Sequence, residues 1–116
     1  MYKIEMYSDS KGWEPVTEFL LEQKEQNPAI FEKILAHIRL LEEKGTWQGM
    51  PHVEHLDGDI WELRPSPYRI LFFVERGGTY VLLSWFRKKT QKTPKKELSL
   101  AKKRMKDYII RNNDEQ

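Results

Sequence analysis

The hydrophobic pattern of the chain changes its period at Gly45, and this change constrains the fold more than any other feature. Before Gly45, apolar residues recur at helical spacing in two segments, one beginning near Pro15 and one lying between Asn27 and Gly45. Proline suits the first turn of a helix and glycine suits the position after its end, so the boundaries agree with the periodicity. Two short consecutive helices predict an antiparallel helical hairpin.

Beyond Gly45 the sequence predicts strands. Glycine-containing turns divide the apolar stretches into two hairpins, as is typical of an antiparallel sheet. The expected strands, in chain order, are Val53–Leu56, Ile60–Arg64, Tyr68–Glu75 and Thr79–Phe86. The last two are apolar on both faces, which predicts central strands covered on two sides. Alternation of Tyr2, Ile4 and Met6 with polar neighbours indicates another strand at the N-terminus.

A last helix is expected after Thr93-Pro94, because four apolar residues recur there at helical spacing: Leu98, Ala101, Met105 and Tyr108. The final residues, about 111–116, are expected to form a frayed tail. We read the order as β-α-α-β-β-β-α. It predicts a single α+β domain over residues 1–116, with an antiparallel twisted sheet packed by the helical hairpin and by a basic C-terminal helix.

Positive charge is concentrated between Arg87 and Lys106. This stretch holds ten Lys/Arg residues and one acid, Glu97, and subtracting its +9 from the +2 of the whole chain leaves −7 elsewhere. Exposed lysines on a helix are ordinary, but here acids are almost missing at the i,i+4 positions that would balance them. Nucleic acid is the leading candidate partner. The cations expected to contact it are Arg87, Lys89, Lys92, Lys95, Lys96, Lys102, Lys103 and Lys106.

Composition excludes several other classes of protein. The chain has no cysteine, which removes disulfides, thiolate metal sites and cysteine nucleophiles and suits a reducing cytoplasm. No stretch approaches the roughly 20 apolar residues that span a bilayer, and no signal peptide is apparent. The acidic residues and the three histidines lack metal-site spacing, and no nucleotide-binding glycine motif occurs. We therefore expect a cytoplasmic protein without membrane partner, metal or cofactor.

A second informative segment runs from Trp61 to Ile70. Strand alternation places Glu62 and Arg64 on one face, and Arg69 follows a short proline-containing turn on the neighbouring strand. Antiparallel pairing would bring all three side chains together, and guanidinium groups match phosphate geometry bidentately. A single Glu–Arg pair is more commonly an ordinary surface ion pair. Cations from several strands at one end of the sheet strengthen the functional interpretation.

Further candidates flank this face. Arg87, Lys88 or Lys89 at the end of the last strand would add positive charge to it. His52 and His55 lie near the first hairpin, where either could act as general base or acid, since histidine titrates near neutrality.

These segments resemble the RelE/HigB superfamily of type II toxins, and in particular its HigB-like group of phage-derived Gp49-like proteins. The resemblance rests on Trp61-Glu62-Leu63-Arg64, on Tyr68–Phe73 and on Phe86–Pro94, and it covers most of the chain. It implies a ribosome-dependent mRNA interferase that needs no metal. The implied reaction is attack of the ribose 2′-hydroxyl on the adjacent phosphate, giving a 2′,3′-cyclic phosphate and a 5′-hydroxyl. The implied partners are the ribosome, mRNA and a cognate helix-turn-helix antitoxin of the HigA type.

The resemblance also implies roles for individual residues. Arg69 matches the family arginine that stabilises the phosphate, and Arg64 occupies a strand position that is commonly cationic in the family. Lys88 falls near the family's basic residue after the last strand, with Arg87 and Lys89 as alternatives in register.

The chain also departs from the family pattern. Ile60 and Glu62 stand where RelE has lysines, and Pro94 falls near the position of the C-terminal tyrosine that acts in RelE. Glu62, His55 or a lysine with a lowered pKa are therefore the candidates for general base and acid.

Two other functions fit the same scaffold. One is a ParE-like toxin that inhibits a topoisomerase by protein binding, and the other is a catalytically silent nucleic-acid-binding module or corepressor. Fold does not choose among them, because function depends on the site. Arginines on two strands together with the basic segment favour the nuclease.

Overall fold

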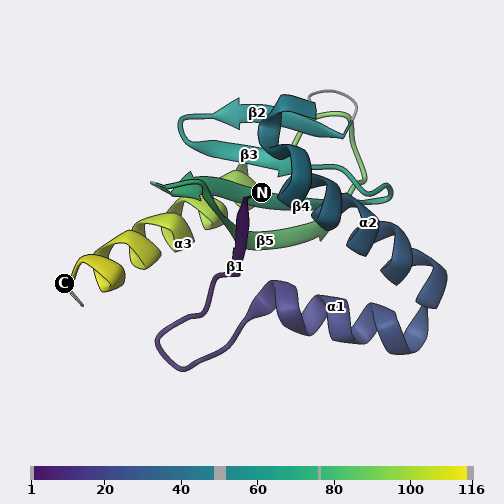
Figure 1. Ribbon diagram of the computed structural model, residues 1–116, viewed down its shortest axis with the longest axis horizontal. Coiled ribbons are helices and arrows are strands. Elements are labelled where there is room, and N and C mark those ends of the chain that lie inside the picture. The colour runs from purple at the N-terminus through teal and green to yellow at the C-terminus, as the bar shows by residue number, and fades with distance from the viewer. Residues whose placement is uncertain (1, 49–51, 76, 115–116) are drawn as a thin grey trace.

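A five-stranded sheet with helices on both faces forms the computed structural model, which describes residues 2–48, 52–75 and 77–114 (Figure 1). The α+β fold class predicted from the sequence is confirmed. The elements are β1 (Lys3–Met6), α1 (Pro15–Gln26), α2 (Pro28–Lys44), a 3₁₀ helix η1 (Gly45–Gln48), β2 (Val53–Asp57), β3 (Ile60–Leu63), β4 (Tyr68–Glu75), β5 (Thr79–Arg87) and α3 (Lys95–Asp114).

The sheet differs from expectation in two details. Its strand order is β1-β5-β4-β3-β2. All four segments expected to be strands after the helical hairpin are strands, whereas the expected order β-α-α-β-β-β-α counted only three of them. Four of the strands pair antiparallel, but β1 runs parallel to β5, with Lys3 opposite Thr79 and Met6 opposite Leu82. Parallel pairing requires a long connection, which α1, α2 and the following strands provide. The alternation of apolar and polar residues in β1 does not indicate whether the strand runs parallel or antiparallel to its neighbour.

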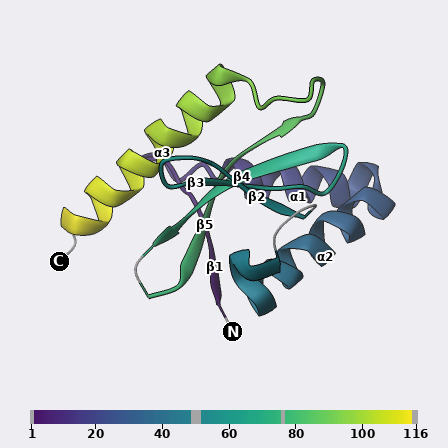
Figure 2. The same cartoon turned by 90° about the horizontal axis from the view of Figure 1, so that it is seen from above.

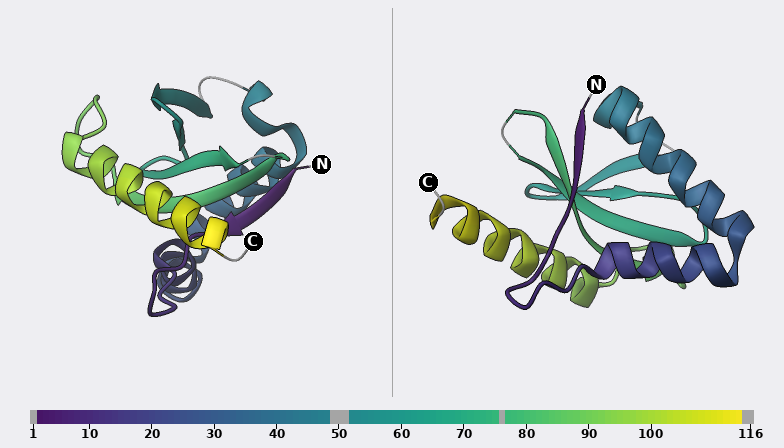
Figure 3. Two further views of the ribbon diagram at one scale, coloured as in Figure 1. Left: turned by 90° about the vertical axis from the view of Figure 1, so that its left-hand side faces the viewer. Right: turned by 60° about the horizontal axis from the view of Figure 1, so that its bottom comes forward.

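The helical hairpin covers one face of the sheet. At the end of α1 the chain turns back into α2, as Figure 3 shows. The apolar stripes of both helices pack on the sheet residues that alternate toward them, which buries most of this side. This cluster contains Val16, Phe19, Ile34, Ile38, Leu41, Val53, Leu63, Ile70, Phe72, Tyr80 and Leu82.

Helix α3 covers the other face (Figure 2). Ala101 and Tyr108 pack there against Leu71, Phe73 and other apolar residues of the central strands. The expected fraying from Arg111 onward is wrong for residues 111–114, which are helical. Arg111 is fixed by Asp107 at 2.9 Å, one helical turn earlier, a contact that stabilises the end of the helix. Residues 115 and 116 lie outside the described segments.

We predict that Gly45→Ala destabilises the fold strongly. Gly45 has φ of +61°, and a Cβ there would lie 2.3 Å from Tyr80 Oη and 2.8 Å from Tyr2 Cε2. We expect the free energy of unfolding to fall by about 3 kcal/mol, from backbone strain and the clash together. The measurement is urea unfolding followed by circular dichroism.

Gly12→Ala is the matched control, because Gly12 also has positive φ but no heavy atom within 4 Å of the added Cβ. It should suffer only the backbone strain, about 1–2 kcal/mol. Equal destabilisation of the two variants would contradict the close approach at Gly45.

Candidate functional site

A buried carboxylate stands at the centre of the candidate site. Glu62 on β3 is only 2% exposed, and its Oε1 accepts a hydrogen bond from Arg64 Nε at 3.0 Å. Arg69 Nε lies 3.7 Å from the same oxygen. The structure therefore brings together the three side chains that strand alternation places on one face. They lie on the α3 side of the sheet, since Glu62 pairs in register with Leu71 of the α3-facing cluster.

The turn between β3 and β4 positions the two arginines. Tyr68 N–H donates to the carbonyl of Pro65 at 2.9 Å and closes the turn. Pro65 and Pro67 both lie in this connection between the strands, where the sheet does not need a backbone N–H from either residue. On the other side, Arg64 N–H donates to the carbonyl of His52 at 2.9 Å. The backbone around Arg64 is thus held from two directions.

Arg64 is shared between two carboxylates. Besides Glu62, its guanidinium pairs with Glu54 from β2, which stands opposite Glu62 in the antiparallel register. Burial lowers the pKa of Arg64, and the nearby Arg69 cation lowers it further. An arginine pKa begins so high that the group stays protonated, so Arg64 remains a cation. Its side chain keeps 19% exposure, so a ligand at the surface can still reach it.

Arg69 is the more enclosed of the two arginines. It is 6% exposed, and its guanidinium donates to the carbonyl of Tyr68 at 2.9 Å and to Ser66 Oγ at 3.4 Å. These contacts fix the guanidinium beneath the β3–β4 turn. Of the two, Arg64 is therefore better placed to contact a substrate. Arg69 is buried behind it, next to the same oxygen of Glu62.

Two contributors were missed by the sequence analysis. Thr93 Oγ1 donates to Glu62 Oε2 at 2.6 Å, which ties the segment before α3 to the sheet. Its sequence signal, Thr93-Pro94, was interpreted only as a helix start. Glu54 could have been found, because the same alternation that orients Glu62 also orients its partner across the β2–β3 hairpin.

Lys88 is the cation after β5 that shares a face with the arginines. Its N–H donates to the carbonyl of Pro67 at 2.8 Å and extends the β4–β5 ladder by one residue. Arg69 pairs with Phe86 in that ladder, so alternation returns to the arginine face at Lys88. Arg87 falls on the opposite face, where its guanidinium lies 5.7 Å from the centre of the Tyr68 ring.

His55 is not part of this arrangement, which corrects an expectation from the sequence. It pairs in register with Trp61, and the two rings lie 5.1 Å apart on the face opposite Glu62. Its Nε2 is 2.6 Å from the carbonyl oxygen of Gly58. The ring of His52 lies 5.3 Å from that of His37. His52 contacts Arg64 through its backbone carbonyl, and the ring contacts of the two histidines are with His37 and Trp61.

The remaining predicted cations are exposed and spread from the loop after β5 along α3, as far as the β2–β3 turn, where Lys102 contacts Asp57. Lys89 and Lys92 lie in the loop before α3, and the exposed lysines of α3 are Lys95, Lys96, Lys102, Lys103 and Lys106. Lys102 is paired with Asp57 at 2.5 Å, so its charge is partly balanced. Arg104 points inward instead and donates to the Leu83 carbonyl and Ser84 Oγ, at 3.0 and 2.9 Å.

Metal-binding and membrane-spanning features are missing from the part of the chain that the structure describes. No group of three or more His, Asp or Glu side chains in residues 2–48, 52–75 and 77–114 could hold a metal ion. None of the helices in these segments is long and apolar enough to cross a bilayer.

Comparison with known proteins now places the chain. Residues 21–106 match the family described as phage-derived protein Gp49-like (DUF891). The chain belongs to this family. A search among curated proteins finds no significant match.

Two solved structures share the fold of the chain. The YoeB–YefM complex from Staphylococcus aureus contains a chain that superposes with a TM-score of 0.55 at 14% identity, covering 78% of this chain and 99% of that one. A structure of the heterotetrameric YoeB–YefM toxin–antitoxin complex from the same organism gives 0.55 at 13% identity with the same coverage. At such identity the likeness shows the fold. The Gp49-like chain thus has the fold of RelE-superfamily toxins, as the sequence resemblance implied.

We predict that Glu62→Ala costs far more stability than Glu54→Ala. Removing Glu62 leaves the enclosed guanidinium of Arg69 without its carboxylate partner, and breaking a buried ion pair in this way costs about 3–5 kcal/mol. Glu54 has a 40% exposed side chain, so its removal should cost about 1 kcal/mol or less. Urea unfolding compares the two, and similar destabilisation would show that Glu62 is not the centre of the network.

Proposed function

We propose that this Gp49-like protein is the toxin of a toxin–antitoxin pair and acts as a ribosome-dependent endoribonuclease on mRNA. The observation that carries the proposal is the convergence of two guanidinium groups on Glu62 at one end of the sheet, beside an exposed cationic loop. Such an arrangement suits a phosphodiester, which requires positive charge where negative charge develops in the transition state.

The reaction we propose is internal transesterification. The ribose 2′-hydroxyl gives its proton to a solvent water molecule while its oxygen forms a bond to the adjacent phosphorus. The bond to the 5′-oxygen breaks and that oxygen takes up a proton, so the products are a 2′,3′-cyclic phosphate and a 5′-hydroxyl. The accessible part of Arg64 binds the phosphate oxygens and stabilises the phosphorane, while Arg69 maintains the local positive potential.

The proton donor to the leaving oxygen is the remaining role in the site, and Glu62 is not suited to it. Both oxygens of Glu62 already accept hydrogen bonds, from Arg64 and Thr93, so Glu62 positions the arginines. Lys88 lies on the same face and is exposed, so we propose that it donates a proton to the leaving 5′-oxygen.

The partners follow from the same proposal. The exposed lysines from the β5–α3 loop onward would bind ribosomal RNA and mRNA phosphates. The two similar structures hold YoeB together with YefM, which supports an antitoxin as a second partner of this chain. We propose an antitoxin of the helix-turn-helix, HigA-like type.

Arg64→Lys should abolish growth arrest while preserving the fold. Lysine keeps the charge but loses the planar fork that binds two phosphate oxygens, so we expect cleavage to fall by at least about tenfold. The readout is growth after induced expression, combined with mapping of mRNA 5′ ends with and without active ribosomes.

Arg39→Lys is the matched control, since Arg39 is an exposed arginine on α2, away from the site. It should remain fully toxic. Full toxicity of folded Arg64→Lys contradicts the proposed site. DNA damage without mRNA cleavage would indicate topoisomerase inhibition, and an unaffected culture would indicate a silent binding module.

The double variant Lys95→Ala/Lys96→Ala should weaken RNA binding and its dependence on salt. Both lysines are exposed at the start of α3. Each RNA phosphate that the variant no longer neutralises should reduce the slope of log affinity against log salt by about 0.7 for single-stranded RNA. A polyuridine oligomer titrated at several salt concentrations gives this slope, and Lys24→Ala on α1 serves as the control. An unchanged slope in the double variant would remove α3 from the RNA interface.

A further inference from the structure

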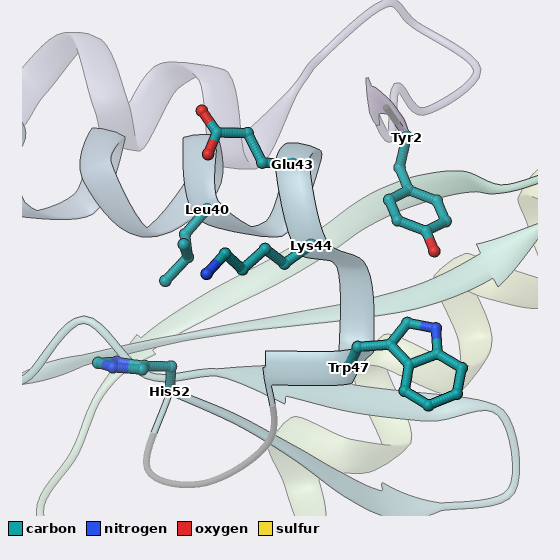
Figure 4. A pocket seen from close by; sticks show the side chains of 6 residues that line it. All are labelled: Tyr2, Leu40, Glu43, Lys44, Trp47 and His52. Atoms are coloured by element: carbon teal, nitrogen blue, oxygen red, sulfur yellow. The ribbon is translucent and has the colours of Figure 1, made fainter.

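A tryptophan protrudes from the opposite side of the molecule. Trp47 in η1 is 87% exposed, more than any other large hydrophobic side chain in the described segments. It borders an open hollow of about 590 Å³, shown in Figure 4. The residues lining the hollow are Tyr2, Leu40, Glu43, Lys44, Trp47 and His52. In the close-up, Tyr2 and Trp47 lie at one end of the hollow and His52 lies at the other.

The backbone that carries Trp47 is held firmly. Gly45 begins η1 in close contact with Tyr2 and Tyr80, and Thr46 N–H donates to Tyr80 Oη at 3.3 Å. The rings of Tyr2 and Tyr80 lie 5.1 Å apart and form the floor under this turn. An exposed tryptophan beside a hollow is a common anchor of a protein interface, because its side chain buries a large apolar area on binding.

The charges around Trp47 do not suit nucleic acid. Helices α1 and α2 together carry six glutamates and four Lys/Arg residues, in contrast to the cation-rich α3. The rim of the hollow has one acid, Glu43, and one base, Lys44, both exposed. Neither takes part in a salt bridge within the segments that the structure describes. A surface with both signs of charge and an aromatic anchor suits a protein.

We propose that this hollow binds a second copy of the chain across a two-fold axis. A two-fold interface uses the same patch on both copies, so the patch must complement itself. In the proposed dimer, Trp47 of each copy enters the hollow of the other, and Glu43 and Lys44, which offer both signs of charge at the rim, pair across the axis. The basic segment from Arg87 to Lys106 carries ten Lys/Arg residues and one acid, so its net positive charge would repel a second copy. The proposal is independent of the nuclease proposal, since the arginines lie on the other face of the sheet and stay uncovered.

Sedimentation of the full chain from low to high micromolar concentration tests the proposal. We expect a mass that rises toward twice the 14.0 kDa of one chain. Trp47→Ala should stay monomeric throughout. Leu21→Ala removes another exposed apolar side chain, 61% exposed on α1, and should dimerise like the wild type.

Charge reversal tests the pairing across the axis. Glu43→Lys or Lys44→Glu alone places like charges opposite each other twice, and each should shift the wild-type equilibrium to monomer. The double variant Glu43→Lys/Lys44→Glu recreates both pairs and should dimerise again, which also shows that the single variants do not fail by misfolding. Lys24→Glu on α1 is the control and should leave dimerisation unchanged.

Several outcomes would overturn the proposal. A wild type that stays monomeric at every concentration would leave the hollow to another protein, such as an antitoxin. A dimer that survives Trp47→Ala would be built on a different surface. A double charge variant that stays monomeric while folded would rule out the Glu43–Lys44 pairing.

Discussion

The buried carboxylate of Glu62 is the interaction on which the candidate site depends. It holds Arg64 and Arg69 from neighbouring positions of the β3–β4 hairpin, and it anchors Thr93 at the entrance to α3. Two guanidinium groups confined this closely would repel each other and lose hydration without a shared anion. Glu62 supplies that anion inside the protein, and a phosphate could supply a second one at the exposed part of Arg64. The same carboxylate fixes where the basic segment leaves the sheet.

Local signals in the sequence predicted much of the fold, because each depends on neighbours within a few residues. Proline and glycine marked the helix ends, and alternation marked the strands. The direction of β1 relative to its neighbour and the length of α3 could not be predicted in this way. The parallel pairing of β1 with β5 depends on residues more than seventy positions apart, such as Lys3 and Thr79. The helical order of residues 111–114 depends on Arg111, which contacts Asp107 and also the carbonyl of Ser8. Neither the strand pairing nor the contact with Ser8 has a local signature.

The same difference between local and long-range contacts decides which residues of the candidate site could be predicted. Glu62, Arg64 and Arg69 were predicted together because one short turn connects them. Thr93 was missed because it meets Glu62 across 31 positions of sequence. His55 was misplaced although the sequence held the answer: in a regular hairpin, its neighbour Glu54 and not His55 shares the face of Glu62. The structure therefore places the carboxylate of Glu54, and not the imidazole of His55, beside Arg64. Lys88 is an exposed cation at the end of β5 on the same face.

The most direct test is single-turnover cleavage of ribosome-bound mRNA by the purified protein, with chemical analysis of both new ends. We expect a 5′-hydroxyl and a 2′,3′-cyclic phosphate, and no cleavage when the nucleotide before the break carries a 2′-deoxyribose. Cleavage of the 2′-deoxy substrate, or products with 5′-phosphates, would contradict attack by the 2′-hydroxyl on a phosphate held by the arginines around Glu62.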